Sequence, residues 1–362
     1  MHSKPIDTHT AVCFTLWFST HNNHRYADLF PRLDALVRFY KLILSRHRVL
    51  RAFQYRLWRA LSRKLLYPGV FRYLGQRYET LFTVDCDQIP AWPRRESVIV
   101  DIDDPVFSPT EVQLLNLPQV KTIVVTTAKA KTMFEQLGVA RPICVIPQGV
   151  SMEQFDPYKI QEIRAQFKGE RDVVTGYHAP TLTLSCDGPS RARGDQDDLD
   201  FLFAALEKAR EVDPRIKLWL FGEPSEAVKQ YAAEGGAGWI KLFGYLRLAD
   251  LLNYISNLDI GVYPRTWSPP PGRFSIKIAQ FMACGVPVVS TRADEAFIVQ
   301  EAQCGIVCAS QEYFSKALVE LALAPERRTE LGKSGQRYAM TNLNWDKLMR
   351  RYEQMFRDRS LR

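Results

Sequence analysis

Short apolar runs alternate with longer amphipathic segments along most of this chain. The runs are rich in Val, Ile, Leu and aromatic residues, which predicts buried strands. In the segments between them apolar residues recur every three or four positions, which predicts helices. Strands that alternate with helices are typical of an α/β protein with parallel sheets. The predicted strands occupy 11–18, 78–84, 97–105, 120–127, 142–146, 172–177, 216–222, 239–245, 259–264, 287–290 and 304–308.

One segment, 33–66, is apolar at helical spacing and also strongly basic. From Arg32 to Tyr78 the chain has twelve Arg or Lys and one acidic residue, while the whole chain has a net charge of +8. The pattern predicts a basic amphipathic helix that ends at Pro68-Gly69. Three interpretations of it stay open: it lies on an anionic membrane surface, it packs on the N-terminal sheet with solvated arginines, or it binds nucleic acid. We favour nucleic acid least, because no nucleic-acid motif accompanies the charge.

The stretch 272–291 predicts a loop, a helix, a tight turn and a buried strand. Ser275 can cap the helix, because its hydroxyl can accept from a first-turn amide, and Gly285 can end it. Free amides at a helix N-terminus, with Lys277 in the first turn, suit a bound phosphate or diphosphate. The alternative interpretation is an ordinary helix–strand unit of an α/β domain.

Two motifs carry a resemblance to a known family. Phe281-Met-Ala-Cys-Gly-Val-Pro-Val-Val-Ser290 resembles the C-terminal signature of glycosyltransferase family 4, whose members have the GT-B fold. Ile146-Pro-Gln-Gly-Val150 resembles the family segment that leads into the linker between the domains. The resemblance implies two Rossmann-like domains facing across a cleft: 1–165 for the acceptor, 166–340 for the nucleotide-sugar, and a crossover helix in 341–362.

The resemblance also implies a donor site. The residues it assigns there are Arg193, Gly244, Tyr245, Arg273, Phe274, Ser275, Lys277 and Gln280. Ser275, Lys277 and Arg193 would hold the diphosphate, and Gln280 would take the ribose-binding position. Gly272 and Gln280 stand where the family usually has two glutamates, so neither carboxylate is present. Just before the next helix, where the family usually has a basic residue, this chain has Asp197 and Asp198.

Polar residues follow two predicted strands of the N-terminal half. His21 and His24 lie in the loop after the first strand, and Asp101, Asp103 and Asp104 end a later one. Carboxyl ends of strands are ligand positions in open α/β sheets. His24 and Asp103 are therefore the candidate catalytic residues, since either could hold or accept a proton. The alternative is that the histidines are solvated and the aspartates cap helices or turns.

Composition limits the remaining possibilities. The seven cysteines are scattered, with no C-x-x-C pair, so we expect reduced thiols and neither a disulfide framework nor a structural metal. No apolar run is long enough for a transmembrane helix and the N-terminus lacks a signal-peptide pattern, so we expect a cytoplasmic protein that is peripheral on a membrane if 33–66 binds lipid.

Together these observations predict a retaining glycosyltransferase with a nucleotide-sugar donor, a glycan or lipid-linked acceptor and no cofactor. The alternative is a catalytically silent GT-B protein that acts as a scaffold or partner in glycan assembly.

Overall fold

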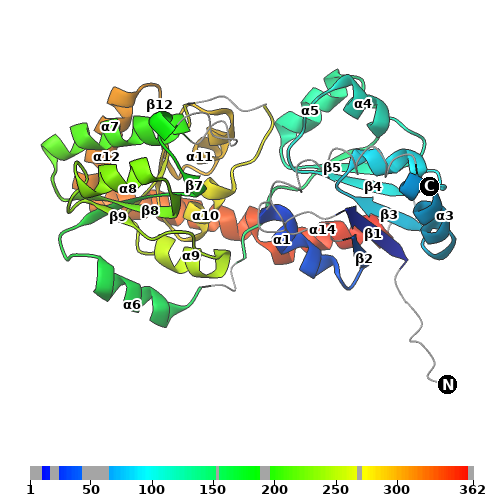
Figure 1. Ribbon diagram of the computed structural model, residues 1–362, viewed down its shortest axis with the longest axis horizontal. Coiled ribbons are helices and arrows are strands. Elements are labelled where there is room, and N and C mark those ends of the chain that lie inside the picture. Colours follow the sequence, from blue (N-terminus) through cyan, green and yellow to red (C-terminus); the bar gives the residue numbers. More distant parts are fainter. Residues whose placement is uncertain are drawn as a thin grey trace. The chain divides into compact units, whose positions relative to one another are not determined.

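The computed structural model of the protein describes residues 10–16, 24–42, 65–151, 155–187, 196–266 and 271–357 (Figure 1). By packing, the chain divides into two compact units. Unit 1 comprises Met1–Gln148, Gly272–Phe274 and Asp346–Arg362, and unit 2 comprises Gly149–Pro271 and Ser275–Trp345. Residues 149–165, which we had predicted in the N-terminal domain, thus pack with unit 2. Each unit contains a parallel six-stranded sheet, so the α/β class is confirmed.

Unit 1 has the strand order β2-β1-β3-β4-β5-β6. Its core is formed by apolar residues of the strands with Phe71 and Trp92. The last helix of the chain, α14, belongs to this unit, where Phe82 of β3 contacts Tyr352. The strands are β1 (Ala11–Leu16), β2 (Val37–Leu42), β3 (Thr80–Thr83), β4 (Val98–Ile102), β5 (Val120–Val125) and β6 (Ile143–Val145), and the helices are α1 (His24–Leu33), α3 (Tyr67–Arg77), α4 (Pro109–Leu115), α5 (Ala128–Gln136) and α14 (Trp345–Arg357).

The prediction of one helix over 33–66 is wrong at both ends. Val37–Leu42 is a strand, β2, whose register with β1 starts at Ala11 opposite Val37. The apolar residues of this segment fit a helical period and also the alternation of a strand. Pairing with β1 favours the strand over the helix. At the other end Leu65 and Leu66 form a π-helical turn directly before α3, and Pro68 lies in the first turn of α3, so the helical structure runs through Pro68 and does not end there. Residues 43–64 lie outside the described residues, and the helix predicted there stays a prediction.

Unit 2 has the strand order β12-β11-β10-β7-β8-β9. The strands are β7 (Val173–Leu182), β8 (Ile216–Pro224), β9 (Ile240–Leu242), β10 (Ile260–Tyr263), β11 (Val288–Thr291) and β12 (Gly305–Cys308). The helices are α6 (Pro157–Phe167), α7 (Gln196–Val212), α8 (Glu226–Ala233), α9 (Leu248–Ile255), α10 (Ile276–Ala283), α11 (Phe297–Glu301), α12 (Gln311–Leu323) and α13 (Pro325–Tyr338).

Both faces of this second sheet are covered, as the alternation along β8 shows. Leu218 and Leu220 face the core that the sheet forms with α7 and α12. Trp219 contacts Phe167 of α6 and Phe243 after β9, and Phe221 contacts Tyr254 of α9. In Figure 1, α7, α8 and α12 lie on one side of β8 and β9, and α6 and α9 lie on the other. A parallel sheet buried on both faces explains why its strands are apolar throughout.

The strand predicted over 172–177 is longer in the structure, where we had expected a loop from His178 to about Gln196. β7 continues to Leu182 and stays paired with β8 through an irregularity between His178 and Thr181. His178 is therefore a buried strand residue, and its ring packs edge-on against Phe281 of α10. The rest of the predicted loop includes 188–195, which lie outside the described residues.

Candidate functional site

The strand order of the second sheet marks one position as a ligand site. From β7 the chain adds β8 and β9 on one side, then returns to place β10, β11 and β12 on the other. The order therefore reverses between β7 and β10. In open α/β sheets ligands bind outside the carboxyl ends of the strands at such a reversal. In unit 2 this position is bordered by Tyr177 of β7, by Arg265 after β10 and by the start of α10.

The start of α10 is built as the sequence predicted. Ser275 is the N-cap, and its hydroxyl accepts a hydrogen bond from the Ile278 amide at 3.4 Å. Gly285 follows the last turn with a φ of 69°, in the left-handed region that favours glycine. The other N–H groups in the first turn of a helix have no hydrogen-bond acceptor within that helix. The N-terminus therefore offers N–H donors and the positive end of the helix dipole.

Lys277 lies in this first turn beside an aromatic residue of β7. Its ammonium nitrogen is 3.5 Å from the Tyr177 hydroxyl and 5.0 Å from the centre of the Tyr177 ring. Tyr177 itself is buried, so the ring fixes where the flexible lysine can lie. The predicted pair of Ser275 and Lys277 is thus brought together with Tyr177, which sequence reasoning missed.

A second cation stands after β10. The Arg265 guanidinium has one nitrogen 3.5 Å from the Asp198 carboxylate and another 3.4 Å from the Tyr263 hydroxyl. Asp198, in the first turn of α7, also accepts from the Thr266 amide at 2.9 Å. Burial raises the pKa of Tyr263, which stays a neutral phenol. Neither member of this ion pair was singled out as a ligand from sequence, although Asp198 stands at the position where the resemblance led us to expect a cation.

Gln280, on the next turn of α10, is almost fully buried at 1% exposure. Among the described residues its side-chain oxygen Oε1 has no hydrogen-bond partner. A buried acceptor without a partner costs about 1–3 kcal/mol, so a donor that reached it would be favoured. A ribose hydroxyl as this donor stays a prediction.

The three residues before Ser275 belong to unit 1 by packing, whereas Ser275 belongs to unit 2. They are Gly272, Arg273 and Phe274. The Thr127 hydroxyl donates to the Gly272 carbonyl at 2.7 Å, and Arg273 Nε is 3.3 Å from Asp104. Gly272 has a φ of 83°, and an added Cβ would lie 3.0 Å from the Ala130 Cα. A glutamate at 272 would therefore be strained, which gives a physical reason for glycine here. A donor-binding role for Arg273 and Phe274 stays a prediction.

The other predicted donor residues are placed differently. Gly244 has a φ of 70° and its carbonyl accepts from the Gly222 amide at 2.8 Å, so it shapes the turn after β9. Tyr245 is 51% exposed. Their contact with a nucleobase stays a prediction, and Arg193 lies outside the described residues.

Unit 1 has a cavity of about 450 Å³ at the carboxyl ends of β3 and β4. Among its lining residues five are acidic and none is Lys or Arg; the acidic residues are Asp85, Asp87, Asp103, Asp104 and Glu111. Burial raises the pKa of Glu111, although amides of Val106 and Phe107 donate to it. Asp103, predicted from sequence, lines this cavity. His24 begins α1, and its side chain lies outside what the structure describes.

Asp101 differs from these carboxylates because it is fully buried and both of its carboxylate oxygens accept hydrogen bonds. Arg25 donates to both of its oxygens, at 2.9 and 3.0 Å, and also to the Pro147 carbonyl. The Tyr352 hydroxyl of α14 accepts from Arg25 at 2.6 Å and donates to Asp101. Burial raises the pKa of Tyr352, so the phenol keeps its proton. This network anchors α1 and α14 to the sheet and is not available for chemistry.

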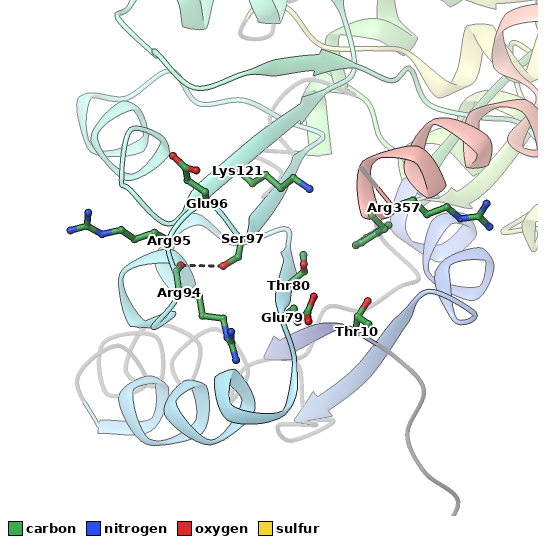
Figure 2. A pocket seen from close by; sticks show the side chains of 10 residues that line it. Thr10, Glu79, Thr80, Arg94, Arg95, Glu96, Ser97, Lys121 and Arg357 are labelled. Carbon is green, nitrogen blue, oxygen red and sulfur yellow. Dashed lines mark hydrogen bonds between the residues drawn. The ribbon is translucent and has the colours of Figure 1, made fainter. Parts of the chain in front are cut away.

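A second cavity, of about 620 Å³, lies at the opposite, amino edge of the first sheet. Figure 2 shows Arg95 and Arg357 extending to opposite sides of it, with Ser97 and Thr80 between them. Lys121 at its rim donates to the Met355 carbonyl of α14. None of the residues predicted for a site lines this cavity.

The described residues contain no group of three or more His, Cys, Asp or Glu that could hold a metal ion. In the same part of the chain no helix is long and apolar enough to cross a membrane. All seven cysteines are free thiols, as predicted, and burial raises the pKa of Cys284 and Cys304 to about 12.

Comparisons with known proteins agree with this geometry. A family model described as glycosyl transferases group 1 matches residues 188–323. A GDP-mannose-dependent monoacylated alpha-(1-6)-phosphatidylinositol monomannoside mannosyltransferase of Corynebacterium glutamicum is 24% identical over 207 residues, which is 56% of this chain and 52% of that protein. The match thus spans about half the length of this curated relative.

Solved structures are similar over nearly the whole chain. HepE of Anabaena, solved with UDP-glucose, has a TM-score of 0.69 at 16% identity and covers 95% of this chain and 98% of its own. WaaG, a glycosyltransferase involved in lipopolysaccharide biosynthesis, has a TM-score of 0.65 at 14% identity, covering 96% and 99%. At these identities the likeness concerns the fold.

Proposed function

We propose, on the premise that this chain has the GT-B fold and resembles the glycosyl transferases group 1, that it transfers a sugar from a nucleotide-sugar to an acceptor hydroxyl. Unit 2 binds the donor, and the observation that carries this assignment is the N-terminus of α10 with Lys277 beside it at the strand reversal. Helix amides and a lysine together suit a diphosphate, which is both leaving group and anchor.

Unit 1 binds the acceptor in the cavity at the ends of β3 and β4. Carboxylates there can accept hydrogen bonds from several sugar hydroxyls, and charged acceptors bind a hydroxyl more strongly than neutral ones do. Asp103 is the candidate for the group that holds the reacting hydroxyl. The bond from the anomeric carbon to the diphosphate oxygen breaks, a bond to the acceptor oxygen forms, and the hydroxyl proton passes to the Asp103 carboxylate. By resemblance the anomeric configuration is retained and no metal takes part.

Two finer statements belong to the same proposal. The acceptor is a glycan or a lipid-linked glycan, as the names of the mannosyltransferase and of WaaG suggest for those proteins. The protein is cytoplasmic and peripheral on an anionic membrane through the part of the basic segment 33–66 that follows β2. Sedimentation with anionic vesicles tests the second statement, and no binding at low salt would remove it.

A second candidate function is a catalytically silent scaffold in glycan assembly. The observation that favours it is the absence of both usual glutamates, with glycine held in place at 272 and an unpaired amide oxygen at Gln280. Mass spectrometry of the full chain with GDP-mannose, UDP-glucose and related nucleotide-sugars separates the two. Release of a nucleoside diphosphate supports the transferase, and binding without release over hours supports the scaffold.

A further inference from the structure

Asp197 and Asp198 stand where the resemblance implies a basic residue, and Asp198 pairs with a cation from another part of the sheet. Asp198 lies in the first turn of α7 and is 2% exposed. Its carboxylate faces Arg265, which arrives from the loop after β10, the strand adjacent to β7. The first turn of α7 therefore carries the partner of a cation that another strand supplies.

Several contacts fix Arg265 at this place. The Asp198 carboxylate accepts from the Thr266 amide, and the Thr291 hydroxyl of β11 donates to the Arg265 carbonyl. The guanidinium also lies 5.4 Å from the Tyr263 ring centre. Backbone and side chain are thus both held, on the central strands of the sheet. The side chain keeps 14% of its surface exposed at the carboxyl ends of the strands.

Arg265 and Lys277 both border the strand reversal between β10 and β7. Arg265 follows β10, and the Lys277 ammonium is 3.5 Å from the Tyr177 hydroxyl of β7. A partly buried cation acts more strongly on an anion than a solvated one, because the local dielectric is lower. Arginine further offers donors in a planar fork that matches phosphate oxygens.

We propose that Arg265 binds the diphosphate of the donor together with Lys277, and that Asp198 is the positioning residue that holds Arg265 for it. The inference rests on the proposed function, since it names the ligand of the same site. Asp198 compensates the arginine while the site is empty, because an unpaired cation at this depth would be costly. The loop after β10 thus supplies a cation beside the first turn of α7.

The test is isothermal titration of the full chain with UDP and GDP and with the matching nucleosides, uridine and guanosine. For Arg265→Ala we expect the affinity for the nucleoside diphosphate that binds to fall about 10- to 100-fold, as loss of a charged hydrogen bond predicts. The nucleoside affinity should stay within about twofold, because the nucleoside carries no phosphate. Arg265→Lys should be intermediate, because it keeps the charge and loses the fork.

Asp198→Asn should weaken diphosphate binding by about 3- to 10-fold, again without a change for the nucleoside, because the charge-assisted contact that positions Arg265 becomes a neutral one. Arg327→Ala, at an exposed arginine of α13, is the matched control and should leave both affinities unchanged.

If Arg265→Ala lowered the affinities for the nucleoside and for the nucleoside diphosphate equally, Arg265 would have only a structural role and the inference would be overturned. Unchanged affinity for the diphosphate would overturn it as well. If the wild-type chain binds neither diphosphate, the proposed function itself fails, and the inference with it. Arg265→Lys keeps the test decisive if the alanine variant does not fold.

Discussion

The two units place opposite charges at the carboxyl edges of their sheets. In unit 1 the carboxylates line the cavity, while the cation Arg25 is fully buried. In unit 2 the cations Lys277 and Arg265 border the strand reversal, while the carboxylate Asp198 is buried. The same sheet architecture therefore leaves acidic groups for a ligand in one unit and basic groups in the other.

Burial decides which charge is left for a ligand. Arg25 and Asp101 hydrogen-bond to each other in full burial, so loss of either would leave the other as a buried, unpaired charge, and the pair has no capacity for a substrate. The charges that stay accessible then define what can bind. A diphosphate suits the second unit, and a neutral, hydroxyl-rich molecule suits the first, where a free phosphate would be repelled.

The largest effect is expected where the charge is wholly structural. Asp101→Ala leaves Arg25 buried without its partner and should lower the free energy of unfolding by about 3–5 kcal/mol, measured by chemical denaturation. Asp104→Ala is the control, since this carboxylate is largely exposed beside Arg273 and should cost less than about 1 kcal/mol. Equal losses for the two variants would contradict the distinction between structural and accessible charge.

Lys277→Ala tests the cationic edge. We expect the affinity for a nucleoside diphosphate to fall about 10- to 100-fold, because a charge-assisted contact is lost, with the nucleoside affinity and the melting temperature unchanged. Lys241→Ala, a lysine of β9 that lies over Phe167, serves as the control in titration calorimetry. If the Lys277 variant bound the diphosphate with unchanged affinity, this edge of the sheet would not be the diphosphate site.

Asp103→Asn tests the acidic edge. It should raise the KM for the acceptor about tenfold, since a neutral amide oxygen accepts from a hydroxyl more weakly than a carboxylate does, and it should leave the donor KM unchanged. Steady-state kinetics with the identified acceptor measures both, with Glu96→Gln at the other cavity as the control. A change in donor KM alone would show that the acceptor does not bind in this cavity.

The smallest effect concerns the missing carboxylate of α10. Gln280→Glu should tighten nucleoside binding by about 3- to 10-fold, if a ribose hydroxyl is the donor that the unpaired Oε1 lacks. The same change should lower the melting temperature of the ligand-free protein, because a buried carboxylate without a partner is costly. If the variant bound the nucleoside diphosphate more tightly but the nucleoside with unchanged affinity, Gln280 would not contact the ribose.

Local patterns predicted most of the fold. The α/β class and the Ser275 cap are confirmed, because strand and helix periods and capping chemistry act over a few residues. The GT-B resemblance, which rested on two motifs, is confirmed by the likeness to solved structures. Val37–Leu42 could not be assigned from its pattern, because pairing with β1 decides its conformation. The Arg25, Asp101 and Tyr352 network joins residues distant in sequence, and so does the contact between Asp198 and Arg265. Sequence spacing cannot predict such contacts, because each side chain by itself looks like an ordinary polar surface residue.

The central claim is that unit 2 binds a nucleoside diphosphate linked to a sugar. Isothermal titration of the wild-type chain with a panel of nucleotide-sugars, including GDP-mannose and UDP-glucose, tests it most directly. We expect saturable binding of at least one of them, weakened by added salt because the contacts are ionic. Binding of none at millimolar concentration would contradict it.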